Sequence, residues 1–402
     1  MPHNSKFTIM RKIIPITAAI TFLFSGAADA QIRSGGLTAG GFGEIALSRN
    51  FFSDNVYRYP NAPAHEKEGL GRLEIPHVGF SIGYDFGKGW SMQSELEIAD
   101  AGAGEAALEQ FWIQKSFFPS LNIKAGHFIV PVGGLNNAND PMNYFTVYSP
   151  EGEFTILPSI WHDTGVTIWG EAGKWRYEVQ LIAGPDAFLF SSDNFVKSGA
   201  GAPFEFKAAD QCGIAARIDN SPIKSLSIGL SGYYGKSMHN AYPDDPGTER
   251  HAGVKGAATI GAFDFLYEDS RIIMRGSVDY GHIKHNRTAA GAPYDKSPAG
   301  RGTIACGMEL GYDLFSLFEK LHTSGNRLFV FGRSEYYNPY IRNESQKIAE
   351  FAEKTRVAAG LNWFPIPEIA VKCEYSYRFL AAQYNNKPSI SLGVAFQGFF
   401  TK

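Results

Sequence analysis

Apolar and polar residues alternate along most of the chain. Between Arg72 and Phe86, the apolar side chains Phe80, Ile82 and Tyr84 fall on one face, and glycine, serine and aspartate fall on the other. A period of two residues predicts β-strands with two different faces. Strands are predicted at 37–48, 72–86, 90–99, 105–117, 121–130, 165–170, 174–183, 211–219, 224–235, 252–266, 271–282, 302–313, 327–337, 351–364, 369–379 and 389–400.

The connections between these segments alternate between short and long. Links after even-numbered segments are mostly brief, whereas those after odd-numbered segments are mostly longer, as at 184–210, 236–250, 283–301 and 338–350. One even-side link contains a possible short helix at 315–321. Strands of about ten residues joined in this way are typical of transmembrane barrels. The pattern therefore predicts an all-β fold, a closed antiparallel transmembrane β-barrel of about 16 strands.

The third long connection, from Pro131 to Asp163, interrupts the alternation. It is rich in apolar and aromatic residues and contains Asp140, Glu151, Glu153 and Asp163, but no lysine or arginine. A connection of this length is usually functional or disordered, and this one is too apolar for a solvated linker. We expect it to fold into the lumen and narrow it, with these four carboxylates at the constriction.

The first thirty residues have the layout of a secretory signal peptide. Arg11 and Lys12 precede an apolar stretch at 13–24, and Ala28-Asp29-Ala30 fits a cleavage site. We expect residues 1–30 to be this signal, with Met10 as a possible alternative start, and residues 31–402 to form the barrel. Export together with a barrel predicts the outer membrane of a Gram-negative-type bacterium.

Composition excludes several classes of function. A formal net charge of −3 over 402 residues argues against nucleic-acid binding. The cysteines Cys212, Cys306 and Cys373 are odd in number and widely spaced, which suits packing better than a disulfide framework or a metal site. We expect no cofactor and no metal.

Three segments of the sequence resemble a known family. Gly126-His127-Phe128-Ile129-Val130-Pro131-Val132-Gly133 and the later run from Pro158 to Gly170, together with Leu361 to Lys372, are similar to the phosphate-selective porin O and P family. The resemblance implies an outer-membrane porin of sixteen strands, usually trimeric, with its third loop folded inward. The chain departs from this family at its end, where Thr401 and Lys402 follow the aromatic Phe400.

The alternation also sorts charged residues into a candidate pore lining. Basic and acidic members balance, and the basic ones include Lys124, Arg176, Arg217, Arg275, Arg333, Arg356 and Lys372. Basic rings favour anions and acidic rings favour cations, so a balanced lining with an acidic loop predicts weak selectivity for small hydrophilic solutes or ions. The alternatives are an anion- or phosphate-selective channel, with Arg176, Arg217 and Arg275 facing the constriction, and a structural or adhesin-type barrel. The expected partners are membrane lipid, small solutes and two further copies of the chain.

An enzymatic barrel is disfavoured. Ser159, His162 and Asp163 lie within five positions of one another, and residues that close along a chain cannot easily form the geometry that activates a nucleophile. We therefore expect no catalytic residues.

Overall fold

The structure is a computed structural model of the 402-residue chain. It describes residues 36–50, 70–99, 106–136, 140–158, 160–186, 190, 195–200, 211–236, 255–286, 299–322, 325–342, 352–380 and 387–401. The expected signal peptide, and most of the long connections other than the third, lie outside the described residues.

The described elements are mainly strands. The strands are β1 (Gly36–Asn50), β2 (Leu70–Glu74), β3 (His77–Gly87), β4 (Trp90–Ala99), β5 (Ala106–Phe118), β6 (Leu121–Ile129), β7 (His162–Ala172), β8 (Trp175–Ile182), β9 (Gly213–Ile223), β10 (Leu226–Gly235), β11 (Lys255–Glu268), β12 (Ile272–Asn286), β13 (Gly302–Asp313), β14 (Arg327–Ile341), β15 (Lys354–Ile366), β16 (Ile369–Phe379) and β17 (Lys387–Phe399). The helical segments are α2 (Glu151–Ile156), α3 (Lys197–Ala200), the 3₁₀ turn η8 (Leu314–Leu317) and α4 (Glu319–His322).

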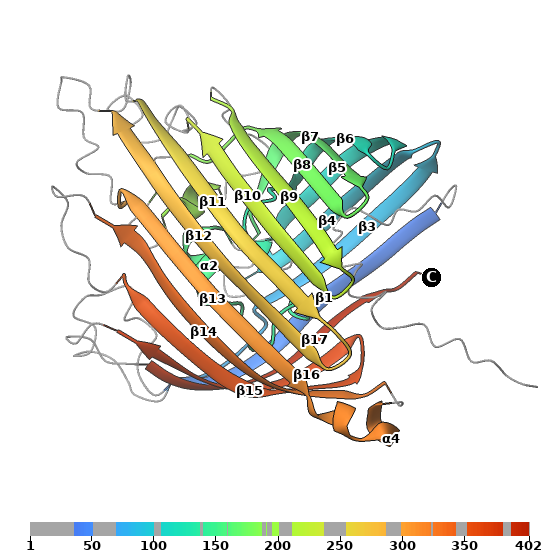
Figure 1. Cartoon of the computed structure of the whole chain (residues 1–402), viewed down its shortest axis with the longest axis vertical. Helices are drawn as coiled ribbons and strands as arrows, with labels where there is room; N and C mark the ends of the chain where they lie inside the picture. The colour runs from blue at the N-terminus through green and yellow to red at the C-terminus, as the bar shows by residue number, and fades with distance from the viewer. Residues whose placement is uncertain are drawn as a thin grey trace, which may run out of the picture.

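The strands form one antiparallel sheet that closes on itself (Figure 1). From β3 to β17 consecutive strands pair with each other, and β1 pairs with β17, from Gly40 opposite Phe399 to Asn50 opposite Ser389. β2 and β3 both pair with β1 and are two pieces of one interrupted strand, so the seventeen labelled strands make a barrel of sixteen. The all-β fold and the closed sixteen-strand barrel predicted from alternation are confirmed.

The exterior of the barrel is apolar. On β3, Phe80 and Ile82 are about half exposed, and on β17 the same is true of Ile390, Leu392 and Val394. The intervening residues, such as Ser389 and Ser391, are buried on the inner face. Such extensive apolar exposure is unfavourable in water, whereas a lipid surround satisfies it. None of the described helices is long and apolar enough to cross a membrane.

Two neighbouring tyrosines show how strictly the two faces are separated. Tyr234 is half exposed on the outside, but Tyr233 points inward and is 3% exposed. An interfacial aromatic belt accounts for Tyr234 and not for Tyr233, which the alternation by itself assigns to the opposite face. The helix predicted at 315–321 appears as η8 followed by α4.

Candidate functional site

The connection between β6 and β7 runs from Val130 to Trp161, and its two ends are tied together. The amide of Val130 donates to the carbonyl of Trp161 at 2.7 Å. Asn136 reinforces this closure, since its Nδ2 donates to the Val130 carbonyl at 2.6 Å and its Oδ1 accepts from the Trp161 amide at 2.5 Å. We call the segment 130–161 the inner loop.

Glu153, on α2, holds the first turn of the inner loop. Its carboxylate accepts hydrogen bonds from the amides of Gly134, Leu135 and Asn136 at 3.2, 2.8 and 3.0 Å. Burial and the nearby Asp264 carboxylate raise the pKa of Glu153 to about 7, although the three amides favour the charged form. Glu153 is 2% exposed, so it acts as an internal anchor of the loop.

Gly133 makes this arrangement possible. Its φ of +88° is a left-handed conformation, and a Cβ there would lie 2.3 Å from Glu153 Oε1. The wall of the barrel also holds this turn, because the Gly133 amide donates to Ser231 Oγ on β10 at 3.2 Å and its carbonyl accepts from Arg217 on β9 at 3.1 Å. The G-x-x-x-x-P-x-G motif therefore ends in a turn attached to the inner face of the barrel.

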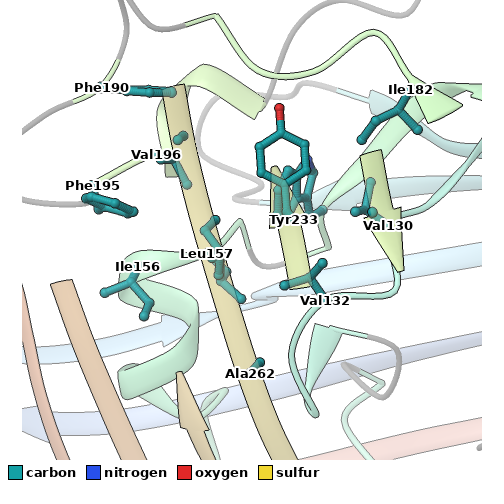
Figure 2. Close-up of a cluster of buried hydrophobic side chains, with 14 of the residues drawn as sticks. Val130, Val132, Ile156, Leu157, Ile182, Phe190, Phe195, Val196, Tyr233 and Ala262 are labelled. Carbon is teal, nitrogen blue, oxygen red and sulfur yellow. The ribbon is translucent and has the colours of Figure 1, made fainter. Parts of the chain in front are cut away.

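The apolar side chains of the inner loop pack against the inner face of the barrel. Figure 2 shows Val130, Val132, Ile156 and Leu157 gathered around Tyr233, in a cluster that also includes Phe195 and Val196, just before α3, and residues of β11. Trp161 is fully buried, and its ring meets that of Tyr233 edge-on with centroids 4.9 Å apart. Loop and barrel thus share one hydrophobic core.

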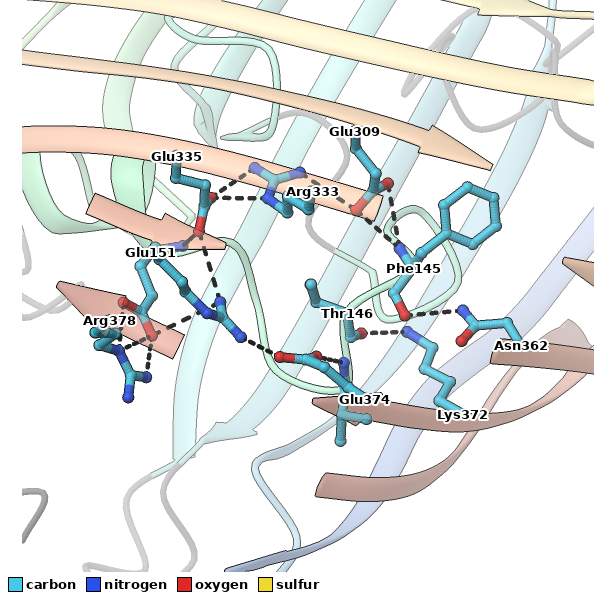
Figure 3. Close-up of polar contacts among 12 residues, drawn as sticks. Phe145, Thr146, Glu151, Glu309, Arg333, Glu335, Asn362, Lys372, Glu374 and Arg378 are labelled. Carbon is cyan, nitrogen blue, oxygen red and sulfur yellow. Dashed lines mark hydrogen bonds and ion pairs between the residues drawn. The ribbon is translucent and has the colours of Figure 1, made fainter. Parts of the chain in front are cut away.

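The middle of the inner loop is bound to β13–β16 (Figure 3). The backbone of Phe145 is held by two side chains of the wall. Its amide donates to both carboxylate oxygens of Glu309 at 3.2 Å, and its carbonyl accepts from Asn362 Nδ2 at 2.8 Å. The ring of Phe145 packs against Phe329 and Phe331 on β14, with centroids 5.0 and 5.5 Å away.

Two further contacts hold this part of the loop to β16. The Val147 amide donates to Glu374 at 2.7 Å. Lys372 Nζ donates to the carbonyls of Pro141, Tyr144 and Thr146, the last two at 2.9 and 3.0 Å. Lys372 is 1% exposed, so its ammonium group interacts with the loop carbonyls and not with solvent.

Glu151, the first residue of α2, is paired with arginines of the wall. Arg378 Nε lies 2.8 Å from each of its carboxylate oxygens, Arg356 approaches to 3.6 Å, and the Tyr337 hydroxyl donates at 2.7 Å. Burial opposes ionisation, but Arg378 and Arg356 outweigh it and hold the pKa of Glu151 well below its ordinary value. Glu151 therefore stays charged and bound.

The other predicted basic residues of the lining also contact acidic side chains. Arg217 makes a bidentate pair with Asp264, at 2.8 and 2.9 Å, and Arg333 contacts Glu335 at 2.7 Å. The remaining pairs are Arg176 with Glu178 at 2.6 Å, Arg275 with Glu309 at 3.3 Å, Arg356 with Glu374, and Lys124 with Glu178 at 3.8 Å. Each predicted basic residue thus faces inward and is close to an acidic or carbonyl partner.

Asp163 lies in a different place from the one expected. The ladder between β6 and β7 continues to the pairs Phe128–Asp163 and Ile129–His162, so β7 begins at His162 and the loop ends at Trp161. Asp163 is fully buried on β7, and its carboxylate accepts from the amides of Thr164 at 2.7 Å and Gly184 at 2.9 Å. The expectation that it belongs to the loop is wrong, because cross-strand pairing extends further than alternation indicates.

Asp140 remains in the loop and accepts from Gln397 on β17. Burial raises its pKa to about 6. Among the described residues, the four predicted loop carboxylates do not form one cluster. Asp140 and Glu151 bind different parts of the barrel, Glu153 binds the first turn of the loop itself, and Asp163 belongs to a strand.

Several inward residues were not singled out from the sequence. Asp264, on β11, is the bidentate partner of Arg217. Glu109 faces inward because a bulge in β5 shifts the register between Glu95 and Leu96, and it lies 3.4 Å from His162 Nε2. His162 is also 2.5 Å from His127. Ser159 lies outside the described residues. Alternation indicates the direction of Asp264, but no sequence signal locates the bulge.

Comparison with known proteins identifies the fold. No protein-family model matches the chain, and an uncharacterised protein of Aquifex aeolicus (strain VF5) is 22% identical over 368 residues, which are 86% of this chain and 76% of that protein. Among solved structures, the trimer form of OmpT from Vibrio cholerae matches with a TM-score of 0.53 at 10% identity, covering 91% of this chain and 100% of OmpT.

Two further solved structures are similar in fold to this chain. The outer-membrane channel DcaP of Acinetobacter baumannii has a TM-score of 0.53 at 11% identity, covering 91% of this chain and 98% of DcaP. Salmonella typhi OmpF has a TM-score of 0.53 at 10% identity, covering 90% of this chain and 97% of OmpF. The chain has the fold of outer-membrane porins. A closed barrel with an apolar exterior belongs in the outer membrane. The finer resemblance to the phosphate-selective family stays a prediction.

Proposed function

We propose that the protein is an outer-membrane porin through which small hydrophilic solutes or ions diffuse passively, with the inner loop narrowing the lumen. The observation that carries this proposal is the attachment of the loop to the far wall. The loop leaves the barrel between β6 and β7, yet Phe145, Val147 and Glu151 bind side chains of β13–β16. A segment held at both sides of a barrel obstructs part of its cross-section.

Weak selectivity follows from the pairing of charges. An inward arginine attracts an anion only to the extent that its charge is uncompensated, and the predicted basic residues contact carboxylates or carbonyls. A strongly anion- or phosphate-selective channel requires free cations at the constriction. The pairing therefore favours a general diffusion pore over the phosphate-selective alternative, and no catalytic step is assigned to the barrel.

Assembly into a homotrimer is part of the proposal. The OmpT structure from Vibrio cholerae that shares the fold is a trimer form, and the apolar exterior of this barrel provides a surface on which copies can pack in lipid. Cross-linking in membranes followed by electrophoresis without heating tests this: a trimeric species is expected, and a monomer at all cross-linker concentrations contradicts it.

Planar bilayer recording tests the pore itself. We expect stepwise ohmic conductance in potassium chloride and a small reversal potential under a salt gradient. A silent protein supports the structural or adhesin-type barrel instead. A reversal potential close to the chloride equilibrium potential supports the anion-selective alternative.

A further inference from the structure

The inward-facing charges are distributed unevenly around the barrel. From β8 to β16 the described wall carries the arginines, each beside a carboxylate. On β3, β4 and β5, by contrast, the described inward positions carry no lysine or arginine; Lys115 on β5 lies outside, against the rings of Trp90 and Phe117. The inward carboxylates of these strands are Asp85 at the end of β3, Glu95 and Glu97 on β4, and Glu109 on β5. We call Glu95, Glu97 and Glu109 the acidic wall.

The polar partners of the acidic wall do not neutralise it. Glu95 accepts from Gln110 at 3.2 Å, which provides no charge. Glu97 Oε1 is 3.0 Å from His77, an imidazole that Glu97 shares with Glu44, and Glu109 is 3.4 Å from His162. Four carboxyl groups, those of Glu44, Glu95, Glu97 and Glu109, thus face two imidazoles in this part of the barrel.

Two carboxylate oxygens of the acidic wall, Glu97 Oε2 and Glu109 Oε2, are buried without a hydrogen-bond partner. Glu97 is 3% exposed, and its Oε2 is buried without a donor. Its neighbours Leu96 and Ile98 point outward, so Glu97 points into the barrel. A buried anion without a donor is costly, and a cation passing nearby compensates it.

Accessibility also differs between the two sides. On β13–β16, where the inner loop is bound, the inward residues Glu309, Asn362 and Glu374 are at most 1% exposed. On β3 and β4 the inward positions Gly83, Gln93 and Glu95 are partly exposed. Of the acidic wall, Glu95 therefore borders a part of the lumen that the loop leaves accessible, whereas Glu97 and Glu109 are buried.

We propose that Glu95, Glu97 and Glu109 set the selectivity of the pore and give it a preference for cations. This inference rests on the proposed function and adds the sign of the selectivity and the residues that determine it. The arginines opposite are held by the loop and by their own acidic partners, so they do not cancel the field of the acidic wall. Permeating cations interact with the wall through water and are not coordinated by it.

Reversal potentials in a potassium chloride gradient test the inference. The wild-type channel is expected to favour potassium over chloride. Glu95 is partly exposed and has a neutral hydrogen-bond partner, so Glu95→Gln is expected to lower the potassium-to-chloride permeability ratio. The triple variant E95Q/E97Q/E109Q is expected to lower this ratio about three-fold. Glu171→Gln, which removes the same charge from an exposed residue at the end of β7, is the control and is expected to leave the ratio unchanged.

The outcomes separate the inference from the proposed function. An open channel without cation preference, or a triple variant that keeps the wild-type reversal potential, overturns the inference while the pore stands. If the triple variant does not fold, as judged by heat-modifiable electrophoretic mobility, Glu95→Gln alone decides, and an unchanged ratio overturns the inference. A wild-type protein silent in bilayers overturns the proposed function and the inference with it.

Discussion

Arg378 on β16 forms an ion pair with Glu151 on α2, and its Nε lies 2.8 Å from each carboxylate oxygen. The two residues are 227 positions apart in the chain. Both side chains are partly buried, at 17% and 18% exposure, and therefore little screened by water. Charge-assisted hydrogen bonds in such surroundings contribute about 1.5–3 kcal/mol. This pair is a main attachment of the inner loop to the far wall.

Removing the guanidinium is expected to release α2. Arg378→Gln should weaken the attachment by about 2 kcal/mol and raise both single-channel conductance and current noise, because the loop then moves away from β16. Arg271→Gln, at an exposed turn residue, is the matched control and should conduct like the wild type. Wild-type conductance and noise in Arg378→Gln would show that the pair does not hold the loop.

The same attachment should persist in acid. Because Arg378 and Arg356 lower the pKa of Glu151, its contribution to loop stability is complete above the ordinary value of 4.5 and is lost only as the pH falls through the much lower value in the folded protein. The conductance ratio between Glu151→Gln and wild type should therefore be the same at pH 7 and pH 4.5. A ratio that approaches one at pH 4.5 would mean that Glu151 is protonated there and that its partners do not lower its pKa.

Gly133→Ala separates a steric effect from a backbone effect. The new Cβ would lie 2.3 Å from Glu153 Oε1 and would displace the carboxylate from the amides that it binds. Gly173→Ala is the control, since that glycine also has positive φ, +65°, but nothing within 4 Å of the new Cβ. In both variants the left-handed backbone of the new alanine costs about 1–2 kcal/mol of stability. Only Gly133→Ala is expected to raise channel noise; equal behaviour of the two would rule out the clash.

Phe145→Ala is expected to detach the middle of the inner loop. The ring packs on Phe329 and Phe331, and truncating a buried phenylalanine costs about 3–5 kcal/mol. Val147→Cys, in a chain whose three cysteines are replaced by serine, reports the change, because Val147 is 1% exposed. Reaction with a membrane-impermeant thiol reagent should be at least ten-fold faster with Phe145→Ala than with Phe145→Leu. Equal rates would indicate that the ring is not needed to hold the segment.

The barrel was predictable because one local rule determines each strand. On β17 the rule needs nothing beyond period two: Ile390 and Leu392 go to lipid, and Ser389 and Ser391 go to the lumen. The inward direction of Arg217 and Lys372 follows from the same rule. The three-dimensional fold is then the only way for so many two-faced strands to satisfy their backbone groups in hydrocarbon.

The contacts of the inner loop could not be read in this way. The role of Glu153 depends on the φ of Gly133, and the pairing of Glu151 depends on which wall the loop reaches. Glu109 faces inward because of a bulge, and Asp163 belongs to β7 because the ladder begins three residues earlier than the alternation indicates. These features arise from tertiary packing and not from periodicity.

The pairing of β1 with β17 has a consequence for how the molecule is made. These strands hydrogen-bond along Gly40 to Asn50, so the seam joins the first described strand to the last. Until β17 is available, every partial sheet has two exposed edges that invite mispairing or aggregation. If strands are added to the sheet one at a time, no intermediate before β17 is a closed barrel. The chain must therefore be kept from self-association until β1 and β17 pair.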